Sequence, residues 1–299
     1  MQHASRSESQ GENRMTAPNE PSAPTDPTNP GEPTTPADPT AARQPLRRPK
    51  RYGWVPDLPD ARDHLYAAPP RHLAALPASV DLRAQCPPGV YDQGELGSCT
   101  ANAIAAAIEF DLLKDGKPDY PPSRLFIYYN ERAVEGTVDS DSGAMIRDGI
   151  KSVGKLGVCP EPEWPYDITK FAVTPPDRCY QDALVHRVTS YQRVPTVLDQ
   201  FKGCLAAGYP FVFGFSVYDS FETDEVARTG DAPLPDTASE SLLGGHAVLA
   251  VGYDDALGRF RVRNSWGDKW GDHGYFTLPY GYLTDRGLAS DFWTIRSAS

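Results

Sequence analysis

The chain has 299 residues, of which 39% are hydrophobic, so it is long enough to form one large domain or two small ones. Its net charge of −11 argues against a nucleic-acid surface over the whole chain, because binding a polyanion requires clustered Lys and Arg. No segment reaches the roughly 18 apolar residues that cross a bilayer and no signal-peptide pattern opens the chain, so we expect a soluble protein, cytoplasmic or exported without a classical signal.

The first 51 residues form a proline-rich segment. Proline recurs at every third position from Pro18 to Pro39, which favours a solvated polyproline II chain. A basic cluster follows between Arg43 and Arg51. We predict that residues 1–51 are a disordered tail with a basic end, and a ligand for a proline-reading domain is the alternative.

Residues 52–75 differ from this tail because they carry Tyr52, Trp54 and Tyr66 among prolines and charges. Aromatic side chains are stabilised by a surface on which they can lie. We therefore predict an extended arm over residues 52–75 that packs on a globular domain formed by residues 76–299.

The first half of this domain has helical patterns. Apolar side chains recur at three- and four-residue steps over residues 99–113, with Ser98 as the candidate cap and Gly116 after the end. The many small residues of this run favour a helix in close contact with its neighbours. Further helices are predicted at residues 123–132 and 142–156.

The second half has strand patterns broken by Gly, Asp and Asn turns. Strands are predicted at residues 188–194, 209–217, 246–254, 259–266 and 274–279. The DDALGR stretch between the third and fourth of these runs predicts a hairpin turn. A helical first half and a strand-rich second half predict the α+β class, with two subdomains facing each other across a cleft.

The chain contains five cysteines, an odd number, and no pair has CxxC spacing. This spacing indicates neither a zinc site nor a redox dithiol, and no metal or cofactor is predicted. We expect a reducing compartment with one special thiol, Cys99. The other four, Cys86, Cys159, Cys179 and Cys204, are predicted to be structural, and one disulfide among them stays an open alternative.

Cys99 lies at the predicted start of the alanine-rich helix. A helix N-terminus and a nearby imidazolium both lower the pKa of a thiol and so make it a nucleophile. Of the six histidines, only His246 opens an apolar strand directly after two glycines, where an imidazole can project into a cleft. Asn264, eighteen residues later, can hold that imidazole in the required orientation. Taken singly, each of these residues is more often structural.

Gln93, Cys99, His246 and Asn264 occur in the order of the papain-family cysteine peptidases, and the stretch PASVDLR, residues 77–83, resembles the start of their mature domains. The resemblance covers roughly residues 77–296. It implies a papain-like fold, in which a helical subdomain and a β-rich, barrel-like subdomain enclose the active site in a cleft.

The resemblance also implies roles for these residues. Cys99 would attack the scissile carbonyl, His246 would pair with Cys99 and protonate the leaving amine, and Asn264 would orient His246. Gln93 and the backbone N–H of Cys99 would form the oxyanion hole. Trp266 would cover the histidine–asparagine contact and line the leaving-group side. The implied substrates are polypeptides, and we expect a monomer.

The chain departs from the family motif CGSCW, because it reads Leu96-Gly97-Ser98-Cys99-Thr100. Leu96 replaces a cysteine that is usually disulfide-bonded, and Arg286 occupies another such position. Both changes agree with a reducing compartment. Thr100 replaces a tryptophan, which alters packing but removes no chemical group.

Residues 52–75 are too short for the long helical pro-domain of familiar relatives, and they resemble the short N-terminal arm of certain bacterial papain-like enzymes. Our hypothesis is that this arm lies across the cleft and blocks it, with Tyr52, Trp54 and Tyr66 as its anchors. The alternative is an arm that packs away from the cleft.

The substrate-binding residues are inferred by alignment back from the C-terminal strand. Asp291 would lie near the base of the pocket for the second residue before the cut, where an acid favours Arg or Lys, although a structural role is an equal alternative. Gly143 is a candidate for pairing with the substrate backbone. Besides a cysteine endopeptidase, two alternatives stay open: a related thiol acyltransferase or amidase, and a catalytically silent binding protein.

Overall fold

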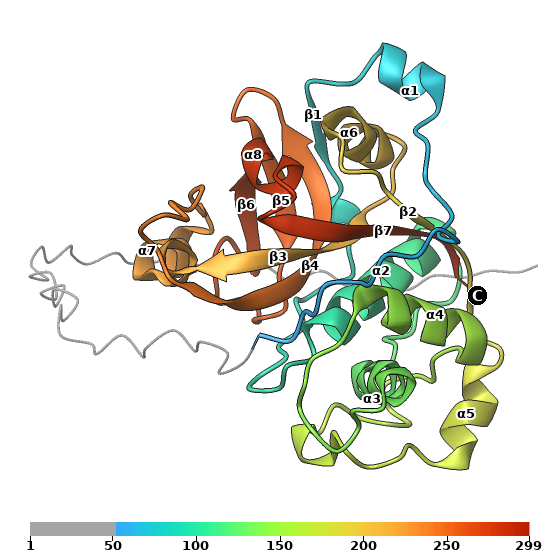
Figure 1. Ribbon diagram of the computed structural model, residues 1–299. Coiled ribbons are helices and arrows are strands. Elements are labelled where there is room, and N and C mark those ends of the chain that lie inside the picture. Colours follow the sequence, from blue (N-terminus) through green and yellow to red (C-terminus); the bar gives the residue numbers. More distant parts are fainter. Residues whose placement is uncertain (1–51, 299) are drawn as a thin grey trace, which may run out of the picture. The chain divides into compact units, whose positions relative to one another are not determined.

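The computed structural model describes residues 52–298, and the predicted tail over residues 1–51 lies outside the described residues. Figure 1 shows a group of helices beside an antiparallel sheet, so the predicted α+β class is confirmed. None of the helices in the described part is long and apolar enough to cross a bilayer.

The elements are named in chain order. The helices are α1 (Pro70–Ala74), α2 (Cys99–Lys114), α3 (Arg124–Glu135), α4 (Ile146–Leu156), α5 (Asp177–Ala183), α6 (Leu198–Ala206), α7 (Asp224–Thr229) and α8 (Tyr280–Thr284). The strands are β1 (Ser79–Asp81), β2 (Val188–Arg193), β3 (Phe211–Tyr218), β4 (Leu242–Asp254), β5 (Arg259–Arg263), β6 (Tyr275–Pro279) and β7 (Ala289–Ala298).

The strands of the described part form one sheet in the order β2-β7-β3-β4-β5-β6, with β1 added beside β4. All of these strand pairs are antiparallel. Because β2 and β6 stand at opposite edges, the sheet is open, and this open sheet is the form that the barrel-like subdomain takes. Phe201 of α6 packs on Phe211, Phe260 and Phe292, which belong to β3, β5 and β7, and so fixes these strands against one another.

Helix α2 is the central helix of the fold. Its residues from Cys99 to Leu112 are all buried, as its small side chains predict. It packs on strands β4 and β7 and on helices α3 and α4, so its first residue lies between the helices and the sheet. Ser98 is the N-cap residue of α2, as predicted, but its hydroxyl makes no capping hydrogen bond, because it is bonded to Tyr166 and Asn102 instead of the helix N–H groups.

Other predicted elements are confirmed with shifted ends. Ser123 caps α3 by accepting a hydrogen bond from the Phe126 N–H. Helix α4 begins at Ile146, four residues later than predicted, because Ala144 pairs with the arm. The five predicted strands are β2 to β6, and β4 and β5 form the predicted hairpin. The sequence patterns did not predict β1, β7 or the helices α1 and α5 to α8, and α1 (Pro70–Ala74) shows that the predicted arm is not extended over its whole length.

All five cysteines are free in this structure. Cys159 and Cys179 lie within hydrogen-bond reach of each other in the core. These two thiols, from the four cysteines that the sequence predicts to be structural, therefore lie next to each other.

Candidate active site

Cys99 is the first residue of α2, and its side chain is fully buried. The backbone of Ala247 in β4 and of Gly53 in the arm lies within hydrogen-bond reach of the thiol. Burial raises the pKa of Cys99 to about 12, although these hydrogen bonds oppose the shift. In this arrangement the thiol is therefore protonated at neutral pH, even though a helix N-terminus favours the thiolate.

His246 lies in β4 opposite Phe215 of β3 and is also fully buried. Its Nε2 is 2.8 Å from Asn264 Oδ1, so Nε2 carries the proton and donates it to the amide oxygen. Trp266 stacks on the imidazole with ring centroids 4.9 Å apart and planes inclined by 24°. The other ring nitrogen, Nδ1, has no hydrogen-bond partner among the described residues. Burial lowers the pKa of His246 to about 4, so the ring is neutral here.

Gln93 is buried in front of α2, and its amide is held at both atoms. Its Nε2 donates to Leu96 O at 2.9 Å, and its Oε1 accepts a hydrogen bond from the Ser265 hydroxyl at 2.6 Å. One Nε2 hydrogen thus remains for another acceptor. Sequence reasoning did not single out Ser265, although its place directly after Asn264 could have indicated it.

The arm runs between the helices and the sheet (Figure 1) and is hydrogen-bonded to both. Trp54 N donates to Gly245 O at 2.9 Å on the sheet side, and on the helix side Ala144 N donates to Gly53 O at 2.8 Å. Val55 N donates back to Ala144 O at 3.0 Å. A Cβ atom at Gly53 would lie 1.7 Å from Gly97 O, so the arm backbone rests directly on the turn that precedes Cys99.

Trp54 fills a pocket in the sheet. Its indole lies against Gly214 and Gly245, where any side chain would collide with it. Its Nε1 donates to Asp291 Oδ2 at 3.1 Å. Asp291 is buried, has a positive φ of 60°, and forms an ion pair with Arg193 at 3.1 Å. The negative charge expected at the base of this pocket is therefore already paired with a guanidinium.

Asp57 continues the arm beyond this pocket. Its carboxylate accepts hydrogen bonds from the Arg147 N–H at 3.0 Å and from Trp293 Nε1 at 2.9 Å. Burial and the nearby carboxylate of Asp291 raise the pKa of Asp57 to about 6. The pKa of this carboxyl group is therefore higher when the arm is docked than when the arm is exposed to water.

The two tyrosines of the arm lie in different places. The Tyr52 ring is edge-on to His246 at a centroid distance of 6.0 Å, and its hydroxyl donates to Glu222. Tyr66 lies apart from the site, buried beside Arg296 and bonded through its backbone N–H to Arg193 O. The expectation that Tyr66 anchors the arm within the cleft does not fit this position, because Tyr66 belongs to the core behind the sheet edge.

Gly143 lies beneath the arm, but the backbone that pairs with the arm is that of the next residue, Ala144. Gly143 has a φ of 71°, and a Cβ there would be 2.1 Å from Gly53 O. The structure therefore brings Cys99, His246, Asn264, Gln93, Trp266, Asp291 and Gly143 to one region, with the arm in contact with it.

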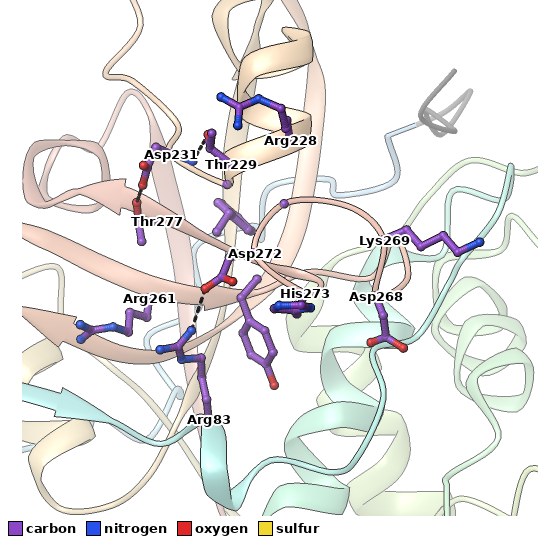
Figure 2. Close-up of a pocket in the computed structure, with 14 residues that line it drawn as sticks. Arg83, Arg228, Thr229, Asp231, Arg261, Asp268, Lys269, Asp272, His273 and Thr277 are labelled. Atoms are coloured by element: carbon purple, nitrogen blue, oxygen red, sulfur yellow. Dashed lines mark hydrogen bonds and ion pairs between the residues drawn. The ribbon is translucent and has the colours of Figure 1, made fainter. Parts of the chain in front are cut away.

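A separate surface pocket of about 800 Å³ contains none of these residues. Figure 2 shows its charged lining, in which Arg83 points toward Asp272 and forms an ion pair with it at 2.9 Å. Side chains of both charges line it, so its net charge favours no class of ligand.

Comparison with known proteins agrees with this geometry. The family model "Papain family cysteine protease" matches residues 76–293, so the chain belongs to the papain family of cysteine proteases, which are hydrolases. An uncharacterized peptidase C1-like protein of Acanthamoeba polyphaga mimivirus is 41% identical over 274 residues, covering 84% of this chain and 88% of the relative.

Among solved structures, xylellain, a cysteine protease from Xylella fastidiosa, is similar with a TM-score of 0.78 and 51% identity. The match covers 84% of this chain and 98% of that one.

A further relative by sequence, Cathepsin B-like CP3 of Giardia intestinalis, is 30% identical over 223 residues, covering 68% of this chain and 69% of the relative.

Proposed function

We propose that this cysteine peptidase cleaves peptide bonds with Cys99 as the nucleophile, His246 as its acid–base partner and Asn264 as the residue that orients His246. The observation that carries the proposal is the His246–Asn264 hydrogen bond next to Ala247, whose backbone lies within hydrogen-bond reach of the fully buried thiol at the start of α2. With Nε2 bound to Asn264, Nδ1 is the nitrogen left to exchange a proton with the thiol.

In the proposed mechanism, Cys99 gives its proton to His246 Nδ1, and the thiolate forms a C–S bond with the carbonyl carbon while the carbonyl electrons move to oxygen. The Cys99 N–H and the free Nε2 hydrogen of Gln93 stabilise this oxyanion. When the tetrahedral intermediate collapses, the C–N bond breaks and the amine takes the proton from His246. Water, deprotonated by His246, then hydrolyses the thioester and releases Cys99.

We further propose that the arm holds the enzyme inactive. Gly53 occupies the space over the nucleophile turn, Trp54 fills the pocket above Asp291, and Tyr52 lies beside His246. The burial imposed by this arrangement keeps the thiol protonated and the imidazole neutral. Release of the arm would return water to both groups and so allow the thiolate–imidazolium pair to form.

The same contacts support roles in substrate binding. Ala144, next to the predicted residue Gly143, offers its N–H and C=O to an extended peptide, as it does to the arm. Trp266 lines the leaving-group side, and Asp291 the pocket filled by Trp54. Because Arg193 pairs with Asp291, we propose that this pocket accepts a neutral N–H donor more readily than the sequence-based preference for Arg or Lys indicates.

The test uses a peptidyl epoxide that alkylates activated thiols, with labelling of Cys99 followed by intact mass. A recognition sequence for a specific protease is inserted at the exposed turn around Arg62, so that cutting frees the docked residues while Tyr66 stays in the core. Labelling of Cys99 only after the cut supports both the nucleophile assignment and inhibition by the arm. Equal labelling before and after the cut contradicts inhibition by the arm.

A Cys99→Ala variant is the control in the same experiment. If neither form of the parent chain reacts, Cys99 is not an activated nucleophile and the assignment fails. Cleavage of an unstructured polypeptide by the cut form then separates a peptidase from an acyltransferase or amidase, which would be labelled without cleaving it.

A further inference from the structure

Two polar residues of the helical subdomain, one buried and one half-buried, have no part in the mechanism above. Tyr128 lies in α3 and is fully buried, and Asp141 lies in the loop before α4. The Tyr128 hydroxyl donates to Asp141 Oδ1 and accepts a hydrogen bond from Gly143 N at 3.2 Å. Asp141 also accepts from Gly97 N, at 3.0 Å to Oδ1 and 3.2 Å to Oδ2. Tyr128 and Asp141 therefore connect Gly97 to Gly143.

The two ends of this connection have distinct places in the site. Gly97 lies in the turn between Leu96, whose carbonyl holds the Gln93 amide, and Cys99. Gly143 precedes Ala144, whose N–H and C=O both pair with the extended backbone of the arm. One end thus fixes the nucleophile and oxyanion turn, and the other fixes the backbone that aligns an extended chain.

No covalent bond provides this connection. All five cysteines are free, and position 96, where the resemblance leads one to expect a disulfide-bonded cysteine, is occupied by Leu96. Hydrogen bonds to a carboxylate are shorter and stronger than those between neutral groups, so Asp141 can tie down a backbone N–H without a disulfide.

We propose that Tyr128 and Asp141 are positioning residues that hold the nucleophile turn in register with the substrate-pairing segment Gly143–Ala144. The proposal rests on the proposed catalytic role of Cys99. It predicts that loss of the connection misplaces a bound peptide relative to the thiol while leaving the thiol and His246 intact. A misplacement of about 1 Å in such a site costs on the order of 10²-fold in rate.

The experiment uses the full chain with Trp54→Ala, which is expected to loosen the arm, as the common background. Tyr128→Phe, Asp141→Asn and Asp141→Ala are compared with Tyr129→Phe. This matched control removes a hydroxyl that is hydrogen-bonded to the Thr174 hydroxyl on the surface, at 2.7 Å. Each variant is assayed for kcat and KM on a peptide substrate, for inactivation by the peptidyl epoxide and by iodoacetamide, and for its melting temperature.

The expected result is a loss of kcat and of epoxide inactivation rate of about 10- to 100-fold in Tyr128→Phe and Asp141→Ala, because both processes need an aligned peptide. Asp141→Asn keeps one acceptor oxygen and should retain part of the rate. Iodoacetamide needs only the thiolate, so its rate should change less than threefold, and Tyr129→Phe should resemble the parent in every assay.

Two outcomes would overturn the proposal. If kcat stays within threefold of the background in folded Tyr128→Phe and Asp141→Ala, the connection does not position the substrate. If the inactivation rates with iodoacetamide and with the epoxide fall equally, the two residues support the thiol's surroundings or the fold. They then do not align the substrate-pairing segment with the nucleophile turn. Failure of the background to react at Cys99 even after the arm is cut at the inserted site would instead refute the proposed function, which is a separate result.

Discussion

Trp54 offers the sharpest test of inhibition by the arm. Its indole fills the space over Gly214 and Gly245, and its Nε1 bonds to Asp291. Removing a large aromatic side chain from a core costs about 3–5 kcal/mol, and Trp54 is only half-buried, so we take about 3 kcal/mol for Trp54→Ala. Since about 1.4 kcal/mol corresponds to a tenfold change in an equilibrium constant, the open population should rise by about two orders of magnitude.

The assay is the second-order rate at which the peptidyl epoxide labels Cys99 in the full chain, followed by intact mass. A probe that needs the open cleft should react about 10²-fold faster with Trp54→Ala. The gain is smaller if release of the arm no longer limits the labelling rate. Leu58→Ala is the control, because Leu58 lies in the same arm but is 69% exposed. An acceleration below threefold, or an equal effect of Leu58→Ala, would refute the energetic argument.

Three further predictions use the same preparation. Gly53→Ala places a methyl group 1.7 Å from Gly97 O, so the arm should fail to dock and labelling should accelerate at least tenfold; an unchanged rate would show that the arm does not rest on that turn. Asp57 has a pKa of about 6 when docked and an ordinary value of 3.8, so the docked state binds more protons. Docking is thus stabilised below about pH 4, and this stabilisation is lost as the pH rises to about 6. The ratio of labelling rates, parent over Asp57→Asn, should therefore rise by up to about 10²-fold between these pH values, and a flat ratio would exclude Asp57 as the titrating group. Gln93→Ala in the Trp54→Ala background should lower kcat by about 10²–10³-fold in a steady-state peptide assay, whereas a loss below fivefold would remove Gln93 from the oxyanion hole.

The sequence indicated those candidate site residues whose signal lies in the neighbouring residues of the chain. Cys99 is recognisable because an alanine-rich helix begins there. His246 is recognisable because an apolar run follows two glycines, although β4 itself begins four residues earlier, at Leu242. The prediction of the α+β class followed from the same periodicities. Gln93 and Asn264 became recognisable through their order along the chain.

The parts that sequence reasoning missed depend on contacts between distant segments. Arg193 is paired with Asp291 although 98 positions separate them in the chain, and nothing in the sequence near either residue indicates this pairing. Composition indicated that the aromatic residues of the arm would be buried, but not on which surface, so Tyr66 was grouped with Tyr52 and Trp54. The same limit applies to Asp141, whose acceptor role depends on how the loop before α4 folds against Gly97.

The burial of Tyr66 and Ala68 has a consequence for how the arm could be displaced. Ala68 N is bonded to the Gln200 side chain at 2.8 Å, and both arm residues belong to the hydrophobic core. Residues 52–57 are thus joined to these core residues by the short segment 58–65, in which Asp63 is itself paired with Arg147 and Arg193. A short tether gives an effective concentration in the millimolar range, which does not change when the protein is diluted. Under the inhibition proposed above, a ligand must therefore compete with an arm that dilution cannot remove, and the closed form can return as soon as that ligand leaves.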